Sequence, residues 1–337
     1  MLIDVHNHFY PPSYLDAIRG GDSVVRLTVD AEGNPCLHYP GDYNVAVLGH
    51  RDIVYRQQVL EHEQVDTQIL TLTTPGTHVE PPERAKRLAS KVNDAFAAIS
   101  RERAPRFSAL ATLPLCDPEA SVVELRRAMT ELGLPGAMLF SNLNGVALSD
   151  ARFEPLYAEA NRLGAVLHIH PTDPVGVEAM TDYWLMPLVG FLFDTTLAAA
   201  KLVFAGVPAR YPDISWVLSH LGGAIPYLAE RLDRGWRAFP DCRANIDKPP
   251  SDYLRQFYFD TVNFDPIALR LAVDFAGAAQ ILAGSDYPHQ IGSIPQMKTS
   301  LSALRVSETE RKLILGDNAA RLYGITSAER SAVTGDQ

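Results

Sequence analysis

The sequence has little of what marks a secreted or membrane-bound protein. It contains only three cysteines among 337 residues, Cys36, Cys116 and Cys242, and none of them forms a C-x-x-C pair. Disulfide bonds are therefore not expected, and a reducing, cytoplasmic location fits best. The N-terminus lacks a basic segment followed by an apolar one, so no signal peptide is expected. We also expect no apolar run of the roughly 20 residues that a membrane-spanning helix needs.

Positive charge is scarce as well. The chain has 30 Lys and Arg against 40 Asp and Glu, a net charge of −10. This balance argues against a nucleic-acid-binding or anionic-membrane surface, but it leaves a small-molecule site open. No G-x-G-x-x-G follows the first apolar segment, so a dinucleotide-binding fold lacks its best evidence.

What the sequence does contain is a repeated alternation of short apolar segments with helical periodicity. Helices are expected over 51–64, from Pro81 to about 99, and over 118–132, 152–163, 188–210, 224–238, 266–276 and 307–322. Strands are expected within 1–10 and over 65–73, 107–113, 136–140, 165–170, 214–220, 258–261 and 280–286. Repeated βα units imply a parallel sheet, and about eight of them predict a closed (β/α)₈ TIM barrel, with a doubly wound open sheet as the alternative.

One segment interrupts this alternation. After the first strand, Pro11-Pro12 opens a loop, and 24–39 contains two β-runs around Glu-Gly-Asn-Pro. We interpret this as a small hairpin insertion after strand 1, covering about 22–42. With 47% hydrophobic residues the chain can build one large core, so a single barrel domain is expected over 1–325. The small, polar segment 326–337 is expected to be a flexible tail.

Polar residues gather where the predicted strands end. His6 and His8 lie on one face of the first strand, because side chains alternate along a strand. His170, His220 and Asp286 end three later strands. In a barrel these ends meet at one face, where active sites form. Three histidines and one carboxylate, with room for water, suit Zn²⁺ at a catalytic site.

The other histidines and two aspartates near strand ends are expected to lie outside the ligand set. His168 shares a face with His170 but lies deeper, so we interpret it as a hydrogen-bonded interior histidine. Asp260 either orients a ligand or caps the next turn, and Asp4 faces the barrel bottom. The remaining histidines fall in loops or on helices and are expected to face solvent: His38, His50, His62, His78 and His289.

Six stretches carry a resemblance to a known family. They are DVHNHF at 4–9, IHP at 169–171, DYWLMPLVG at 182–190, LSHLGGAIPYLAERL at 218–232, AGSDYPH at 283–289 and GDNAARLYGI at 316–325. The chain resembles the amidohydrolase superfamily, and within it the aminocarboxymuconate-semialdehyde decarboxylase-like branch. The resemblance covers nearly the whole chain, loosely between residues 11 and 60.

The resemblance implies one Zn²⁺ per chain, bound by His6, His8, His170 and Asp286. Mn²⁺ or another divalent ion remains an alternative, because ligand type alone does not settle the metal. Binuclear members of the superfamily need a bridging carboxylated lysine at a strand end, and no predicted strand here ends in lysine. The family's catalytic histidine, which contacts the metal-bound water, falls on His220.

The resemblance also implies substrate-binding residues. Trp184 matches a tryptophan that lines the family's pocket. Arg231 matches an arginine that reaches the substrate from a neighbouring subunit, which implies a homodimer or a higher homo-oligomer. A second such arginine falls on Phe239, and this departure puts aminocarboxymuconate semialdehyde itself in doubt as the substrate. A further family arginine aligns with Arg56, although Arg51 competes for that role.

The leading hypothesis is a carboxy-lyase: metal-dependent, non-oxidative decarboxylation of a small unsaturated or aromatic carboxylic acid. Metal-bound water and His220 would handle proton transfer, with Asp286 catalytic as well as ligating. Arg56 and Arg231 would anchor a carboxylate, while Trp184 and Phe239 would form the pocket wall. The alternative is a metal-dependent hydrolase of a lactone, ester or amide at the same mononuclear site. A third hypothesis, from another class, is a barrel that has lost catalysis and serves as a binding protein.

Overall fold

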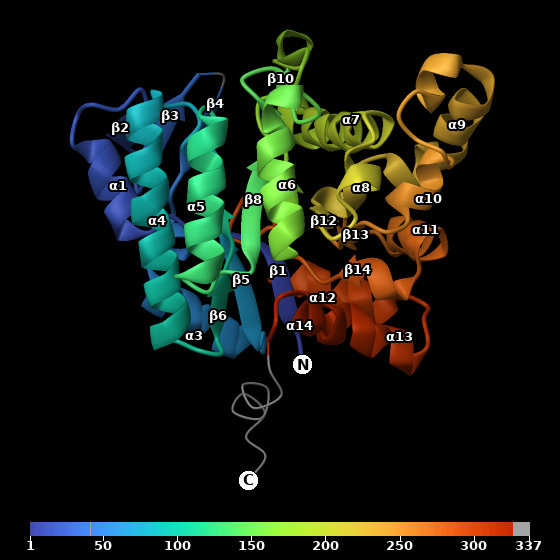
Figure 1. The fold of residues 1–337 in the computed structure, drawn as a ribbon. Helices are drawn as coiled ribbons and strands as arrows, with labels where there is room; N and C mark the ends of the chain where they lie inside the picture. Colours follow the sequence, from blue (N-terminus) through green and yellow to red (C-terminus); the bar gives the residue numbers. More distant parts are fainter. Residues whose placement is uncertain (41, 326–337) are drawn as a thin grey trace.

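The strands form a closed parallel barrel at the centre of the fold (Figure 1). A computed structural model describes residues 1–40 and 42–325, so the expected tail over 326–337 lies outside the described residues. The barrel strands are β1 (Ile3–His8), β5 (Thr67–Thr71), β6 (Phe107–Ala109) continued by β7 (Ala111–Thr112), β8 (Gly136–Phe140), β11 (Val166–His170), β12 (Ser215–Leu218), β13 (Tyr258–Asp260) and β14 (Ile281–Leu282).

The first and last strands meet and close the barrel. The backbone N–H of Val5 donates to the carbonyl of Ala283 at 2.9 Å, and that of His8 donates to the carbonyl of Tyr287 at 2.8 Å. Asn7 and Tyr287 form a parallel bridge. The predicted (β/α)₈ barrel is therefore confirmed, and the open-sheet alternative is wrong. Since β1 starts at the bottom of Figure 1, the C-terminal ends of the parallel strands point upward in that view.

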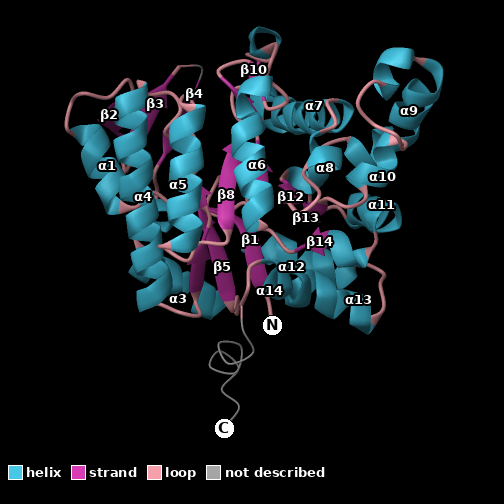
Figure 2. Cartoon of the chain, viewed as in Figure 1, coloured by secondary structure: helices cyan, strands magenta, loops and turns pink. Residues whose placement is uncertain are grey.

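Helices surround these strands (Figure 2). The longer ones are α3 (Ile53–Glu63), α4 (Pro82–Glu102), α5 (Pro118–Thr130), α6 (Glu154–Leu163), α7 (Phe191–Phe204), α9 (Ile225–Ala238), α11 (Pro266–Ala276) and α12 (Ile294–Ala303). The shorter ones are α1 (Pro12–Arg19), α2 (Leu48–Arg51), α8 (Val207–Arg210), α10 (Pro250–Leu254), α13 (Glu308–Lys312) and α14 (Asn318–Leu322). Several begin with a proline in the first turn, where a missing N–H leaves no helical bond unmade.

Two expectations about helices are wrong. The segment after Pro11 is helix α1 rather than a loop, because its prolines occupy the start of the helix while Tyr14, Leu15 and Ile18 are buried. The helix expected over 188–210 is broken after α7, where Gly206 adopts a φ of 75°. Glycine takes this left-handed conformation readily, and the chain restarts there as α8.

The insertion after strand 1 is a 3-stranded antiparallel sheet of β2 (Arg26–Val29), β3 (Pro35–Tyr39) and β4 (Asp42–Val45). A two-stranded hairpin was expected over about 22–42, and β4 extends the sheet beyond it. The sheet is tied to the loop after β5: the Tyr39 hydroxyl donates to Thr74 Oγ1 at 2.9 Å, and Asn44 Nδ2 donates to the Thr74 carbonyl at 2.9 Å. The insertion therefore covers part of the barrel's C-terminal face.

A π-turn over Met186–Gly190 leads directly into α7, and together they form an apolar helix. This Met186–Phe204 helix has 19 residues and a mean hydropathy of 1.5, and 44% of its apolar window is buried. It is long and apolar enough to cross a membrane by length and composition alone, so the expectation of no such run is wrong. Within the described residues its inner side is buried in the main hydrophobic core through Ala199, Leu202 and Val203.

A glycine substitution tests the tight pairing of β8 with β11. A Cβ on Gly136 would lie 1.9 Å from the backbone oxygen of Val166, which no side-chain movement relieves. We expect Gly136→Ala to lower the free energy of unfolding by about 3 kcal/mol or more. Gly20→Ala is the control, because its nearest atom is 3.4 Å away, and its effect should stay within about 0.5 kcal/mol. Urea denaturation measures both, and equal midpoints would contradict the register.

Candidate active site

Five side chains converge at the C-terminal ends of the strands: His6, His8, His170, His220 and Asp286. None is more than 6% exposed. Asp286 Oδ1 lies 3.3 Å from His6 Nε2 and 3.1 Å from His8 Nε2, and Asp286 Oδ2 lies 3.7 Å from His220 Nε2. The His170 ring centre is 4.7 Å from that of His8 and 5.1 Å from that of His6. The structure thus brings together all the residues that the strand ends pointed to.

Asp260 orients this cluster from beneath. Its Oδ2 lies 2.5 Å from His6 Nδ1, which directs His6 Nε2 toward Asp286. The same carboxylate accepts the backbone N–H groups of His220 and Leu221, both at 3.1 Å. Asp260 Oδ1 also accepts the Val262 N–H at 3.0 Å, in the turn after β13. Both alternatives for Asp260 therefore hold, because it contacts a candidate ligand and caps the next turn.

Two candidate residues sit in strained backbone conformations. His220 has a φ of 54° and Asp286 a φ of 58°, values that side-chain-bearing residues rarely adopt. Asp260 stabilises the conformation at His220 by accepting its backbone N–H. At Asp286, the backbone N–H donates to the His6 carbonyl at 2.7 Å. Such strain costs on the order of 1–3 kcal/mol per residue and clusters at functional sites.

The Nε2 atoms of His6, His8 and His170 are the ring nitrogens available to act as metal ligands. His170 Nδ1 lies 2.7 Å from the Pro171 carbonyl and His8 Nδ1 lies 3.1 Å from Thr71 Oγ1, so the Nε2 atom of each ring is the one left for the cluster. Among the described residues, the buried Nε2 atoms of His6 and His170 have no partner in hydrogen-bonding geometry. A buried nitrogen without a partner is costly unless a ligand or an ion compensates it.

Charge in the cluster also fits a cation. Burial works to lower the pKa of His6, but the charges of Asp260 and Asp286 outweigh it and raise that pKa to about 10. Burial holds the pKa values of His8 and His170 well below the usual range, so these rings are neutral. Neutral imidazoles with free lone pairs are the form that binds metals.

The residues fit one divalent ion. Among the described residues, donor atoms within 4.8 Å of one another form three groups: His6 with His170, His220 and Asp286; His8 with Asp286 and His289; and His6 with His168 and Asp260. The first two groups share Asp286, and His8 Nε2 faces the same carboxylate oxygen as His6 Nε2. Three imidazoles and a carboxylate form a donor set typical of Zn²⁺ and acceptable to other divalent metals.

The other histidines differ from the expectations in part. His168 is buried, with Nε2 3.1 Å from Ser219 Oγ, and is the interior histidine that was predicted. His62 faces solvent as expected. The expectation is wrong for His50 and His78, which are 2% and 4% exposed. His38 and His289 are partly buried. Loops that fold over the barrel mouth bury these rings, and local sequence carries no signal of that folding.

Arg56 has a structural position rather than a ligand-facing one. Its side chain is fully buried, with Nε donating to the Gly49 carbonyl at 2.9 Å, Nη1 to Asn7 Oδ1 at 2.8 Å and Nη2 to the His8 carbonyl at 2.5 Å. Each of the three nitrogens donates one hydrogen bond, so Arg56 braces the end of β1, and the anchoring of a substrate carboxylate stays a prediction. Arg51 is also occupied, donating to the Ala46 carbonyl at 2.8 Å.

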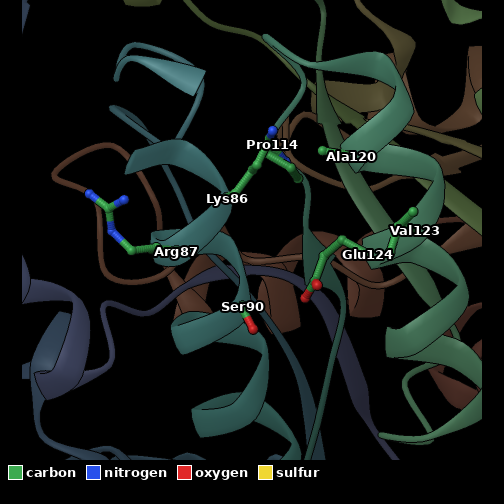
Figure 3. Close-up of a pocket in the computed structure, with 7 residues that line it drawn as sticks. All are labelled: Lys86, Arg87, Ser90, Pro114, Ala120, Val123 and Glu124. Carbon is green, nitrogen blue, oxygen red and sulfur yellow. The ribbon is translucent and has the colours of Figure 1, made fainter. Parts of the chain in front are cut away.

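The other expected substrate-binding residues lie on the surface. Trp184 and Phe239 are 63% and 62% exposed, and Arg231 on α9 is also exposed. The structure does not bring them to the histidine cluster of the same chain. A separate groove between α4 and α5 contains none of the cluster's residues (Figure 3). It is lined by Lys86, Arg87, Ser90, Pro114, Ala120, Val123 and Glu124.

Comparisons with known proteins agree with this geometry. The amidohydrolase family profile matches residues 3–325. The chain is 36% identical to 2-amino-3-carboxymuconate-6-semialdehyde decarboxylase of Dictyostelium discoideum, over 96% of this chain and 92% of that protein. It is 30% identical to 6-methylsalicylic acid decarboxylase of Penicillium expansum, over 95% of each. The crystal structure of 5-carboxyvanillate decarboxylase from Sphingomonas paucimobilis superposes with a TM-score of 0.85 at 27% identity, covering 96% of this chain and 99% of that one.

Replacing Asp260 tests how the cluster is oriented. Asp260→Asn removes the charge beside His6 Nδ1, and we expect metal affinity to fall by about 10- to 100-fold, as for other residues that orient metal ligands. The control is Asp274→Asn, an exposed residue of α11 paired with Arg270, which should leave affinity unchanged. Titration of the metal-free protein against a chromophoric chelator gives both values, and equal affinities would contradict the orienting role.

Proposed function

The chain belongs to the amidohydrolase family, in its aminocarboxymuconate-semialdehyde decarboxylase-like branch, and we propose that it is a metal-dependent decarboxylase of small aromatic or unsaturated carboxylic acids. The observation that carries the proposal is the buried cluster of four histidines and Asp286 at the barrel mouth. Loss of CO₂ needs no redox cofactor, which agrees with the absence of a nucleotide-binding motif from the sequence.

His6, His8, His170 and Asp286 would hold one divalent ion, for which we propose Zn²⁺, with Mn²⁺ as the alternative. When bound, the ion supplies a Lewis acid that polarises the substrate's oxygen atoms. The protein's part is to direct three imidazole nitrogens and one carboxylate to a single point, through the contacts of Asp260, Thr71 and the Pro171 carbonyl.

We assign proton transfer to His220. Its ring borders the cluster, with Nε2 3.7 Å from Asp286 Oδ2, and its buried Nδ1 has no partner among the described residues. As the bond to the carboxylate breaks, the electron pair stays on the substrate carbon, and that carbon takes the proton. Histidine suits this step because its ordinary pKa lies near neutrality. Asp286 holds the ring in place for the transfer.

We further propose that the enzyme works as a homodimer or higher homo-oligomer in the cytoplasm. An apolar surface, which we define by Tyr183, Trp184, Leu188, Phe193 and Tyr227, is exposed by 85%, 63%, 51%, 56% and 79%. Exposed aromatic and aliphatic side chains of this kind are typical of interfaces. Arg231 and Phe239 would then complete the pocket of a neighbouring subunit, and Trp184 would line the pocket. The free cysteines fit a reducing compartment.

The activity is tested with a panel of hydroxybenzoates and carboxymuconates. We expect CO₂ release that a chelator abolishes and added metal restores. His220→Asn should lower kcat by about 100-fold or more with bound metal unchanged, because it removes the proton donor. The control is His62→Asn, an exposed histidine of α3, which should keep full activity. Turnover of simple lactones with no CO₂ from the panel would instead support the hydrolase alternative.

The assembly is tested by introducing a charge into the apolar surface. Leu188→Glu should convert an oligomer into a monomer in sedimentation velocity, because it buries an unpaired charge in the interface. Val123→Glu on α5 is the matched control, since Val123 is 62% exposed outside that surface, and it should stay oligomeric. A fully active wild-type monomer would refute the assembly.

A further inference from the structure

Two histidines that the proposed mechanism does not use lie beside the metal cluster. His289 follows β14, and its ring centre is 4.8 Å from that of His8. His50 lies on α2, and its ring centre is 5.0 Å from that of His289. The rings of His170, His8, His289 and His50 therefore form a continuous row that leads away from the cluster.

The backbone around His50 keeps this ring at the barrel mouth. The Tyr10 N–H donates to the His50 carbonyl at 2.6 Å, directly after the end of β1. The preceding Gly49 packs so closely on the segment after β14 that a Cβ there would lie 2.5 Å from the Tyr287 hydroxyl and 2.9 Å from Pro288. The position of His50 is thus determined by the segments that follow β1 and β14, two of the three strands whose ends carry candidate ligands.

The hydrogen bonding of His50 is incomplete. The side chain is 2% exposed, and neither ring nitrogen has a hydrogen-bond partner among the described residues. His289 has one, because its Nε2 lies 3.2 Å from Thr73 Oγ1. A buried polar atom without a partner costs about 1–3 kcal/mol, so a ring with two of them points to a polar group that binds there.

A second metal ion does not explain the pair. An ion on His8, Asp286 and His289 would need the same His8 Nε2 and Asp286 oxygens as the ion in the main cluster. The other His8 nitrogen contacts Thr71 Oγ1. The two candidate metal sites therefore cannot be occupied at the same time, and His289 and His50 remain available to bind a group other than a metal ion.

The chemistry of His50 favours a hydroxyl group. Burial, then the neighbouring His289 and Arg56, hold the pKa of His50 well below its usual range, so the ring is neutral. A neutral imidazole offers one N–H donor and one lone pair. A hydroxyl both donates and accepts and can pair with such a ring, whereas a methyl group leaves it unpaired.

We propose that His50, positioned by His289, determines specificity by hydrogen-bonding a second ring hydroxyl of the substrate. This inference rests on the proposed decarboxylase function. It predicts a preference for dihydroxylated aromatic acids over otherwise identical acids that carry a methyl group in place of the second hydroxyl.

The test compares 2,6-dihydroxybenzoate with 6-methylsalicylate, which differ only in that group. The wild type should prefer the first by about 100-fold in kcat/KM, because a site built to bind a hydroxyl rejects its apolar analogue. His50→Phe should reduce the preference to within about fivefold, mainly through KM, with metal content unchanged. His50→Asn keeps a donor and an acceptor and should retain part of it. The control His62→Phe should keep all of it.

Product binding separates this inference from the proposed activity. Calorimetry on the metal-loaded protein should give resorcinol a lower Kd than m-cresol in the wild type and similar values in His50→Phe. If neither acid releases CO₂ but this difference in Kd holds, the activity is refuted and the hydroxyl site stands. If the wild type shows no preference in either measurement, or His50→Phe keeps the preference, the inference is overturned.

Discussion

The candidate metal site depends on two buried carboxylates that lie on either side of one imidazole. Asp260 lies 2.5 Å from His6 Nδ1 and Asp286 lies 3.3 Å from His6 Nε2, and both carboxylates are at most 3% exposed. Negative charge in such a place must be balanced, because an unpaired buried charge is very unfavourable. The protein alone balances it with a proton on His6, whose pKa is about 10. A divalent cation held by His6 and Asp286 would balance it as well and would leave His6 neutral as a ligand.

The barrel supplies the rigidity that this arrangement needs. The candidate ligands come from three different strand ends, and contacts with the backbone hold each end. Arg56 braces the end of β1 by donating to the His8 carbonyl and to Asn7, and Asp260 holds the left-handed turn at His220. Residues that contact the candidate ligands from behind therefore determine where the metal-binding atoms lie. The inserted sheet and α2 contact the segments that follow β5 and β1, on the same face of the barrel.

The sequence predicted the barrel and the cluster for the same reason. Apolar strands ending in His6, His8, His170, His220 and Asp286 bring those residues together in any closed parallel barrel. It could not predict the surroundings, which depend on long-range packing. His50 falls in no periodic pattern, and it is buried among residues distant in the sequence, including His289, while Gly49 packs on Tyr287. Arg56 matched a family position, but an alignment does not show whether its nitrogens face a ligand or a backbone carbonyl. Gly206 was too weak a signal to end the predicted helix.

Anomalous diffraction from crystals of the metal-loaded protein, recorded at the absorption edge of the bound metal, tests the central claim most directly. The account predicts one peak per chain, within bonding distance of the Nε2 atoms of His6, His8 and His170 and of an Asp286 oxygen. A second peak beside His289, or a single peak between His168 and Asp260, would contradict it.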